Sequence, residues 1–464
     1  MRLALLFECC AFVIVAMACS GGSKPNNVQG SGGTSAGGGT SSEGGSNAGG
    51  TSSEGGSNAS GGDTSSGGGD TSSIGGVSSV DGGTTSDSGA STSDSGVQGS
   101  VKSVAAGATH VCALLNDGSI QCWGNDVNGE LGDTPATDRC SGANKPNCNS
   151  TPAKVSGITN AVALGSGGDH VCAVLSDGSI QCWGYNIDGQ LGNDSTTNSP
   201  NPVAVSNITN GIAVAGGLFH TCAVLRDGSI QCWGYNFNGQ LGNGSKADSH
   251  VPSVVVGISD AVGVTAGDFH TCAVMRGGAV QCWGDNTYAQ LGDGSTDRSS
   301  VPQLVVGVSN AVQVAAGYGH SCAVLKDGTI QCWGYNSRSQ LGNPSVSSST
   351  VPTVPIPVMV TGVSDAIAVA TGRFHTCAVL SSGIVQCWGN NDAGQLGTGD
   401  TITATAAATV SDITNAVDIE VGDYDSCALL RSGMVQCWGD DSSGQLGNGI
   451  STGISAVPVT VSGL

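Results

Sequence analysis

The chain has 464 residues, and its 14 Lys and Arg against 35 Asp and Glu give a formal net charge of −21. No cluster of Lys or Arg occurs anywhere in the chain, which argues against DNA, RNA or an anionic lipid surface as its partner. The composition also divides the chain, because its N-terminal part differs sharply from the repetitive sequence that follows.

Residues 1–19 resemble an export signal. Arg2 gives a short positive start, and an apolar run follows from Leu3 to Ala18. The run ends in AMACS, which resembles a bacterial lipoprotein cleavage site with Cys19 as the lipidated residue, although Ala16 stands where that pattern prefers Leu. The alternative is an ordinary secretory signal cleaved near Ala18. We therefore expect an exported lipoprotein of the outer membrane or cell surface, facing the periplasm or the extracellular space.

Residues 20–97 consist almost entirely of Gly, Ser, Thr, Asn and Asp, with no aromatic side chain. Such a segment cannot bury enough apolar surface to offset its conformational entropy, so we expect a flexible linker. The linker would tether the remaining part, residues 98–464, to the lipid anchor.

A single motif dominates residues 98–464. HVCALLNDGSIQCWG begins at His110, and close variants begin at His170, His220, His270, His320, His375 and Asp425. Most copies start about 50 residues apart, which is the period of a propeller blade. One blade cannot bury its own apolar face, so the copies must pack against one another.

Each copy predicts four strands. Short β-branched runs alternate with Gly, Asn and Asp turns, and no segment has helical periodicity. In the third copy the expected strands are Val203–Val205, Gly211–Ala215, Thr221–Leu225 and Ser229–Trp233. Seven such units would close radially, which protects the strand edges. Because the first copy has no V-P-x-x-V segment before Val101 and a surplus one stands at Val457–Val461, we expect the C-terminal strand to complete the first blade.

The full pattern G-x-x-H-T-C-A-V-L-x-D-G-x-I-Q-C-W-G-x-N-x-x-G-Q-L-G resembles the regulator of chromosome condensation repeat family, from about residue 98 to residue 464. The resemblance implies a seven-bladed β-propeller. It does not imply one function, because the family includes a nuclear guanine-nucleotide exchange factor, a plant ultraviolet receptor and secreted bacterial inhibitors of β-lactamase.

The cysteines depart from the commoner family pattern. A hairpin closed at Asn116-Asp117-Gly118 would place Cys112 opposite Cys122 in a non-hydrogen-bonded pair, within disulfide reach. An export signal supplies the oxidising compartment. We expect eight disulfides, the last one within an inserted loop: Cys112–Cys122, Cys172–Cys182, Cys222–Cys232, Cys272–Cys282, Cys322–Cys332, Cys377–Cys387, Cys427–Cys437 and Cys140–Cys148. Buried free thiols are the alternative.

The repeated His could form a ring of metal ligands, but a structural role is favoured, because the seventh copy has Asp425 instead. The spacing of nine residues between paired cysteines is also not a zinc-finger spacing. We therefore predict no metal and no cofactor.

The variable residues point to a binding surface. With strands a to d running up and down, the b–c turns and d–a loops share one face, which holds the aromatic residues and both insertions. Aromatic side chains at loop tips are typical of protein-binding surfaces, and the interspersed Asp predict a basic or amide-rich partner. The predicted binding residues are Tyr185, Phe219, Tyr235, Phe237, Phe269, Asp285, Tyr288, Tyr318, Tyr335, Phe374, Tyr424 and Asp440. The alternative is that the rings only seal the blades.

No catalytic motif such as G-x-S-x-G, H-E-x-x-H or a P-loop is present, so we expect a binding protein and not an enzyme. The predicted function is an exported, membrane-tethered propeller that binds a protein and is itself monomeric, with the membrane contacted through the lipid anchor only. The alternatives are a secreted enzyme inhibitor similar to the β-lactamase inhibitors, a glycan-binding module and, by fold analogy alone, a guanine-nucleotide exchange factor.

Overall fold

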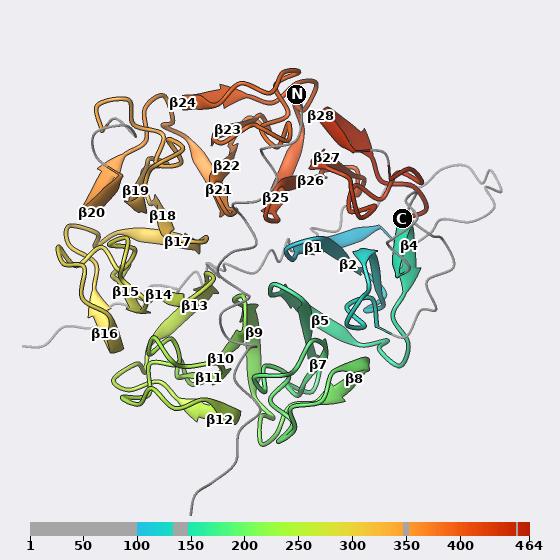
Figure 1. Ribbon diagram of the computed structural model, residues 1–464, viewed down its shortest axis with the longest axis vertical. Coiled ribbons are helices and arrows are strands. Elements are labelled where there is room, and N and C mark those ends of the chain that lie inside the picture. Colours follow the sequence, from blue (N-terminus) through green and yellow to red (C-terminus); the bar gives the residue numbers. More distant parts are fainter. Residues whose placement is uncertain (1–99, 133–146, 347–351, 452) are drawn as a thin grey trace, which may run out of the picture. The chain divides into compact units, whose positions relative to one another are not determined.

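The computed structural model describes residues 100–132, 147–346, 352–451 and 453–464. These residues all belong to one compact unit, Thr71–Leu464, and form seven four-stranded antiparallel sheets around a central channel (Figure 1). The regular elements of the described residues are all strands. These residues contain no helix that is long and apolar enough to cross a membrane. The prediction of an all-β, seven-bladed propeller is confirmed.

The strands are numbered along the chain, four to a blade, from the channel outward. Blade 1 contains β1 (Val101–Ala106), β2 (His110–Leu115), β3 (Ile120–Asn125) and β4 (Cys148–Lys154). Blade 2 contains β5 (Ala161–Ser166), β6 (His170–Leu175), β7 (Ile180–Gly184) and β8 (Ser199–Ala204). Blade 3 contains β9 (Gly211–Gly216), β10 (His220–Leu225), β11 (Ile230–Gly234) and β12 (Ser249–Val254). Blade 4 contains β13 (Ala261–Ala266), β14 (His270–Met275), β15 (Val280–Gly284) and β16 (Ser299–Leu304).

The other three blades follow the same plan. Blade 5 contains β17 (Ala311–Ala316), β18 (His320–Leu325), β19 (Ile330–Tyr335) and β20 (Thr353–Met359). Blade 6 contains β21 (Ala366–Thr371), β22 (His375–Leu380), β23 (Val385–Gly389) and β24 (Ala404–Thr409). Blade 7 contains β25 (Ala416–Val421), β26 (Asp425–Leu430), β27 (Val435–Asp440) and β28 (Ile454–Thr460).

The hairpin between the second and third strands of each blade turns on a glycine of positive φ, which follows Asp in blades 1, 2, 3 and 5. In blade 3, Gly228 has φ +82°, a backbone conformation that glycine adopts without the strain of a Cβ. The Asp227 carboxylate accepts hydrogen bonds from the Ser229 backbone N–H at 3.0 Å and from its hydroxyl at 2.7 Å. This turn fixes the register, which places Cys222 opposite Cys232.

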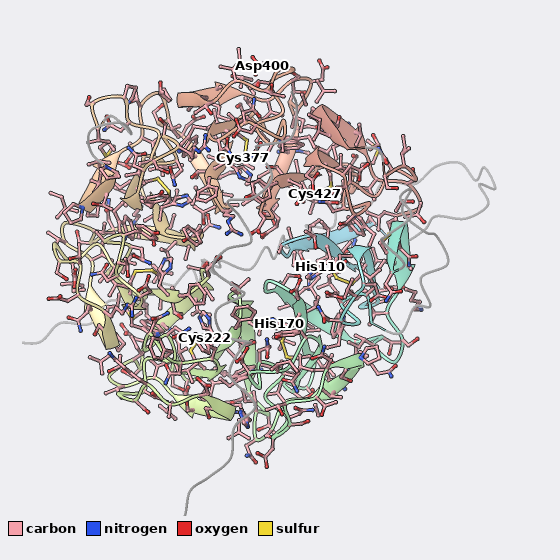
Figure 2. All side chains as sticks on the ribbon, in the orientation of Figure 1. His110, His170, Cys222, Cys377, Asp400 and Cys427 are labelled. Carbon is pink, nitrogen blue, oxygen red and sulfur yellow. A yellow bond between two sulfur atoms is a disulfide. The ribbon has the colours of Figure 1, made fainter. Side chains whose placement is uncertain are left out.

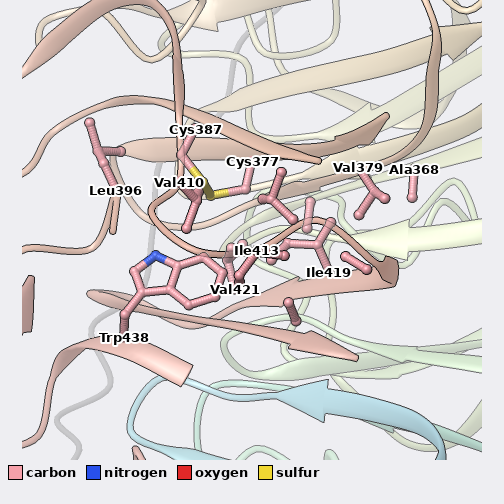
Figure 3. Packing of buried hydrophobic residues seen from close by; sticks show 14 of the residues in the cluster. Ala368, Cys377, Val379, Cys387, Leu396, Val410, Ile413, Ile419, Val421 and Trp438 are labelled. Carbon is pink, nitrogen blue, oxygen red and sulfur yellow. A yellow bond between two sulfur atoms is a disulfide. The ribbon is translucent and has the colours of Figure 1, made fainter. Parts of the chain in front are cut away.

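The core lies between neighbouring blades. The Trp438 side chain of blade 7 packs against Val410, Leu396 and the Cys377–Cys387 pair of blade 6, as Figure 3 shows. Its indole Nε1 donates a hydrogen bond of 2.9 Å to the Gln395 carbonyl. The same indole bond to the preceding blade recurs at all seven interfaces, so apolar packing and at least this buried hydrogen bond join each pair of blades.

The ring does not close as the sequence predicted. β28 pairs with β27 in blade 7, with Cys437 opposite Val459, and does not complete blade 1. The prediction was wrong because the short connections such as residues 205–210 cross to the next blade and form no hairpin. Blades 1 and 7 instead meet by packing, with Trp123 and Val461 in one buried cluster.

Seven of the predicted disulfides are confirmed, one in each blade, and their sulfur atoms are drawn in Figure 2. The paired Cα atoms lie 4.0–4.1 Å apart, because the two cysteines are directly opposite each other. Cys148 is also disulfide-bonded, whereas its predicted partner Cys140 lies outside the described residues, as do Cys19 and the signal and linker segments. Seven disulfides indicate an oxidising compartment.

Candidate binding face

The propeller has two faces of different construction. We call the loop face the one formed by the turns after each innermost strand, such as 217–219, and the loops after each third strand, such as 235–248. These segments lie together, because the Tyr235 backbone N–H donates to the Phe219 carbonyl at 2.9 Å. We call the turn face the opposite one, where the Arg226 N–H donates to the Asn210 carbonyl at 2.9 Å.

Eight of the predicted aromatic residues gather into two clusters on the loop face. In the first, the ring centroids of Tyr185, Phe219, Tyr235 and Phe269 lie 6.0–6.4 Å from their neighbours. In the second, Tyr288, Tyr318, Tyr335 and Phe374 lie 4.4–6.3 Å apart. All eight side chains are half-buried, so each cluster packs within itself and still presents ring surface to solvent.

The two other predicted aromatic residues differ in exposure. Phe237 is 62% exposed, which makes it one of the most exposed large apolar side chains of the propeller. Tyr424 is half-buried in the turn after β25, on blade 7. The rings therefore concentrate on blades 2 to 6, and the aromatic part of the loop face is an arc.

A charged group stands where the central channel opens onto the loop face. The mouth, a recess of about 80 Å³, is lined by the turn residues Leu218, Asp268, Tyr318, Arg373 and Asp423 among others. Arg373 donates from Nη1 to Asp423 Oδ2 at 3.2 Å, and its guanidinium carbon lies 5.2 Å from the Tyr318 ring centroid. The mouth thus joins the second aromatic cluster to an ion pair.

Burial raises the pKa of three carboxyl groups near the channel mouth. It raises the pKa of Asp268 to about 7, and the nearby Asp423 carboxylate adds to the shift. The pKa of Asp423 is also raised by burial, although Arg373 opposes the shift. Burial, together with Asp423, raises the pKa of Asp169 as well. A positive group brought to the mouth would favour the ionised form of all three carboxyls.

Two of the predicted acidic residues hold their own loops together. Asp285 is 7% exposed, and its carboxylate accepts a bond from Gln290 Nε2 at 3.0 Å and pairs with Arg298 Nε at 2.6 Å. Asp440 likewise accepts from Gln445 Nε2 at 2.9 Å. Both lie on the loop face, but their carboxylates are engaged within the blade, so the aromatic arc and the channel mouth offer the more accessible contacts.

The repeated histidines lie inside the interfaces between blades. His170 is fully buried, and its Nε2 lies 2.8 Å from Thr221 Oγ1 of the next blade. Because Thr221 donates its own proton to the Gln190 carbonyl at 2.8 Å, the imidazole must be the donor to the hydroxyl. Burial lowers the pKa of the six repeated histidines to about 3 to 4, so they are neutral. The described residues contain no group of three or more His, Cys, Asp or Glu suited to a metal ion.

Family models for the Regulator of chromosome condensation (RCC1) repeat match this architecture. One model matches seven times, at residues 101–130, 161–190, 212–240, 261–290, 311–340, 366–395 and 416–445. A second model of the same name matches residues 177–224, 227–274, 277–324 and 327–379. Each match of the first model falls on the three inner strands of one blade.

Curated relatives match over short stretches. Protein pim1 of Schizosaccharomyces pombe is 37% identical over 89 residues, which cover 18% of this chain and 16% of that protein. The Ultraviolet-B receptor UVR8 of Arabidopsis thaliana is 31% identical over 94 residues, which cover 20% of this chain and 19% of the receptor. The chain thus aligns with less than a fifth of the length of either relative.

Solved structures share the fold over a longer part of the chain. Human WBSCR16 has a TM-score of 0.66 at 22% identity, covering 75% of this chain and 94% of that one. Prp20p of Saccharomyces cerevisiae has a TM-score of 0.65 at 20% identity, covering 75% and 87%. At such identities the likeness shows the fold alone. Together with the seven repeat matches, it establishes that the chain belongs to the regulator of chromosome condensation repeat family.

Proposed function

We propose that this protein is an exported, membrane-tethered propeller that binds a protein partner through the loop face and catalyses no reaction. The observation that carries the proposal is the aromatic arc, two clusters of four half-buried rings beside a charged channel mouth. Clustered Tyr and Phe supply large contact area at low conformational cost, and such groups supply most of the binding energy in protein interfaces.

The charges at the channel mouth favour a basic or amide-rich contact. Asp268 and Asp423 both interact with Arg373, whose guanidinium is already paired with Asp423, and the Asp423 carboxylate also acts on Asp169. A Lys or Arg side chain of a partner would compensate the remaining carboxyls, and the rings around it would add cation–π attraction.

The histidines bear on the competing class of function, an enzyme. Each of the five from His170 to His375 is buried and hydrogen-bonded to a hydroxyl of the next blade. A neutral, buried imidazole with its N–H engaged is poorly placed to act as a general base on an external substrate. The repeated histidines are therefore assigned to blade packing.

The solved structures of similar fold support protein binding as the class of function. Prp20p is described with binding properties to Gsp1p and histones, and a second yeast structure shows Kap60 bound to RCC1 (Prp20). Guanine-nucleotide exchange is a poor match for this chain, because seven disulfides indicate an oxidising compartment and the nucleotide switch is intracellular. Inhibition of a secreted enzyme would be one form of the proposed binding, whereas a glycan ligand would be a different one, which a glycan array distinguishes.

The test is affinity capture from cell-surface extract with two matched variants. Changing Tyr185, Tyr235 and Tyr335 together to Ala should weaken capture at least tenfold while the melting temperature changes little, because loss of a central interface ring commonly costs about 2 kcal/mol. The control changes Asp177, Asp227 and Asp327 to Ala on the turn face and should capture as well as the wild type. Loss of capture by the control variant alone would reject the proposal, and unfolding of the Tyr variant would show that the rings seal the blades.

The tether has its own test. We expect Cys19→Ser to release the protein from the membrane fraction, because a diacyl anchor depends on that sulfur. Unchanged membrane association would contradict the lipid anchor and leave plain secretion with adhesion through the propeller.

A further inference from the structure

The blades of the ring are not joined equally. At five consecutive interfaces, from blades 2 and 3 to blades 6 and 7, a buried His Nε2 lies 2.8–3.0 Å from the hydroxyl of a Thr or Ser in the next blade. That hydroxyl in turn donates to a Gln carbonyl of the blade that carries the histidine, at 2.8–3.0 Å. We call this pair of bonds the hydroxyl latch. The carbonyl also accepts the Trp indole bond, so each of these interfaces has three linked buried hydrogen bonds.

Blade 1 lacks the hydroxyl latch on both sides. Val171 of blade 2 stands where blades 3 to 7 have Thr or Ser, so His110 has no hydroxyl to donate to. On the other side, blade 1 has Val111 at the hydroxyl position, and blade 7 has Asp425 at the histidine position. Of the three linked hydrogen bonds, only the indole bond is present at these two interfaces, donated by Trp123 at one and by Trp183 at the other.

The missing latches leave buried polar atoms without partners. Nε2 of His110 has no hydrogen-bond partner among the described residues, whereas Nε2 is bonded in the five latched histidines, and neither carboxylate oxygen of Asp425 has a partner; Nδ1 is unpartnered in all six histidines and does not distinguish them. Both residues are at most 1% exposed. An unpaired buried polar group costs about as much as a lost hydrogen bond, so both interfaces of blade 1 are weakened by the two absent bonds of the latch and by an unpaired group.

The seven disulfides between described residues do not compensate for this loss. The disulfide of blade 1, Cys112–Cys122, joins two strands of the same hairpin, as it does in every other blade. No strand is exchanged between blades 7 and 1, because β28 pairs with β27 and β1 pairs with β2. The closure therefore rests on side-chain packing, the Trp123 indole bond and a backbone bond of 2.9 Å from Gly449 N of blade 7 to Ser150 O of blade 1.

From these observations we propose that blade 1 is the opening segment of the ring. It undocks from blades 7 and 2 as a disulfide-held unit while blades 2 to 7 stay latched together. Ring opening at this place exposes the apolar surfaces of Trp123 and Trp183 and needs no strand to be withdrawn from another blade. Local opening of the least stable unit is the general way in which folded domains expose such surfaces.

Native-state hydrogen exchange of the full chain tests the proposal. Protection of the β2–β3 hairpin, residues 110–125, should be lower by at least about tenfold than protection of the equivalent hairpin of blade 4, residues 270–284, because the two latch bonds are absent and one polar group is unpaired at each interface. Equal protection of the two hairpins would overturn the proposal.

A gain-of-latch variant sharpens the test. Val171→Thr adds a hydroxyl that can accept from His110 Nε2 and donate to the Glu130 carbonyl, which already receives the Trp183 indole bond. Exchange in residues 110–125 should slow by at least about fivefold, because the added hydroxyl makes the two buried hydrogen bonds of a latch. The matched variant Thr271→Val removes the latch between His220 and blade 4 and should speed exchange there by a similar factor. An effect of Thr271→Val without any effect of Val171→Thr would also overturn the proposal.

Discussion

The two faces of the propeller are built from the same repeat, but they differ in how much their turn residues vary from blade to blade. On the turn face, Asp117, Asp177, Asp227 and Asp327 each hold the same hydrogen bonds to the Ser or Thr two residues later. On the loop face, the turn residues at equivalent positions range from Ala108 through Leu218 and Tyr318 to Arg373. Turn geometry therefore constrains one face, and the other is free to carry recognition.

This difference predicts that changes on the turn face affect stability and changes on the accessible loop face affect binding. The largest expected effect is at the turn glycines. In Gly228→Ala, the new Cβ would lie 2.6 Å from the Ser259 carbonyl oxygen at a φ of +82°, so we expect a loss of about 3 kcal/mol in the free energy of unfolding. Denaturant unfolding measures it. Gly257→Ala on the same face is the control: its φ is +78° but no atom lies within 4 Å of the new Cβ, and it should cost only about 1 kcal/mol.

The second prediction concerns Glu130, a buried acid of the loop face that lowers the stability of the folded protein as the pH rises. Glu130 stands where the other six blades have Gln, and it is fully buried. Burial raises its pKa to about 7, with the nearby Asp169 adding to the shift. Between pH 4.5 and 7 the unfolded chain ionises at this position and the folded chain does not, so the wild type loses stability as the pH rises.

Glu130→Gln removes this loss. The variant should exceed the wild type by about 2 to 3 kcal/mol above pH 7, and the difference should shrink as the pH falls to 4.5. Unfolding by urea at a series of pH values measures it. A difference that does not depend on pH would mean that Glu130 is ionised in the folded protein, held by its bonds from Asn125 and Asn128.

The smallest effect on stability is expected at Phe237. Because its side chain is 62% exposed, Phe237→Ala should change the free energy of unfolding by less than about 0.5 kcal/mol. Partner capture should nevertheless fall, since the ring stands on the loop face beside the first aromatic cluster. A variant that captures as strongly as the wild type would confine the binding surface to the half-buried rings.

Much of the fold could be predicted because local geometry decides it. The glycine turns fix the hairpin register, so the cysteine pairs follow directly, and Cys222 lies opposite Cys232 as expected. The observed strands of the third copy, such as His220–Leu225, differ by a residue or a few at their ends. The phase of the blades could not be predicted, because a cyclic repeat does not show whether its V-P-x-x-V strand joins the strand before it or the one after.

The contacts between blades were the other part that the repeat pattern concealed. The histidine bond to the next blade depends on the residue after the equivalent histidine, about 50 positions further along. The signal was present, because the copies read HT or HS in blades 3 to 6 but HV in blades 1 and 2. The indole bonds end on main-chain carbonyls such as that of Gln190, which no side-chain pattern can reveal.

The most direct test of the loop face as the binding surface is a hydrogen-exchange footprint of the captured partner on the propeller. Peptides that contain residues 217–219, 267–269 and 317–319 should gain protection in the complex, and peptides that contain residues 226–229 and 276–279 should not change. Protection confined to the second group would place the partner on the turn face and contradict the proposed function.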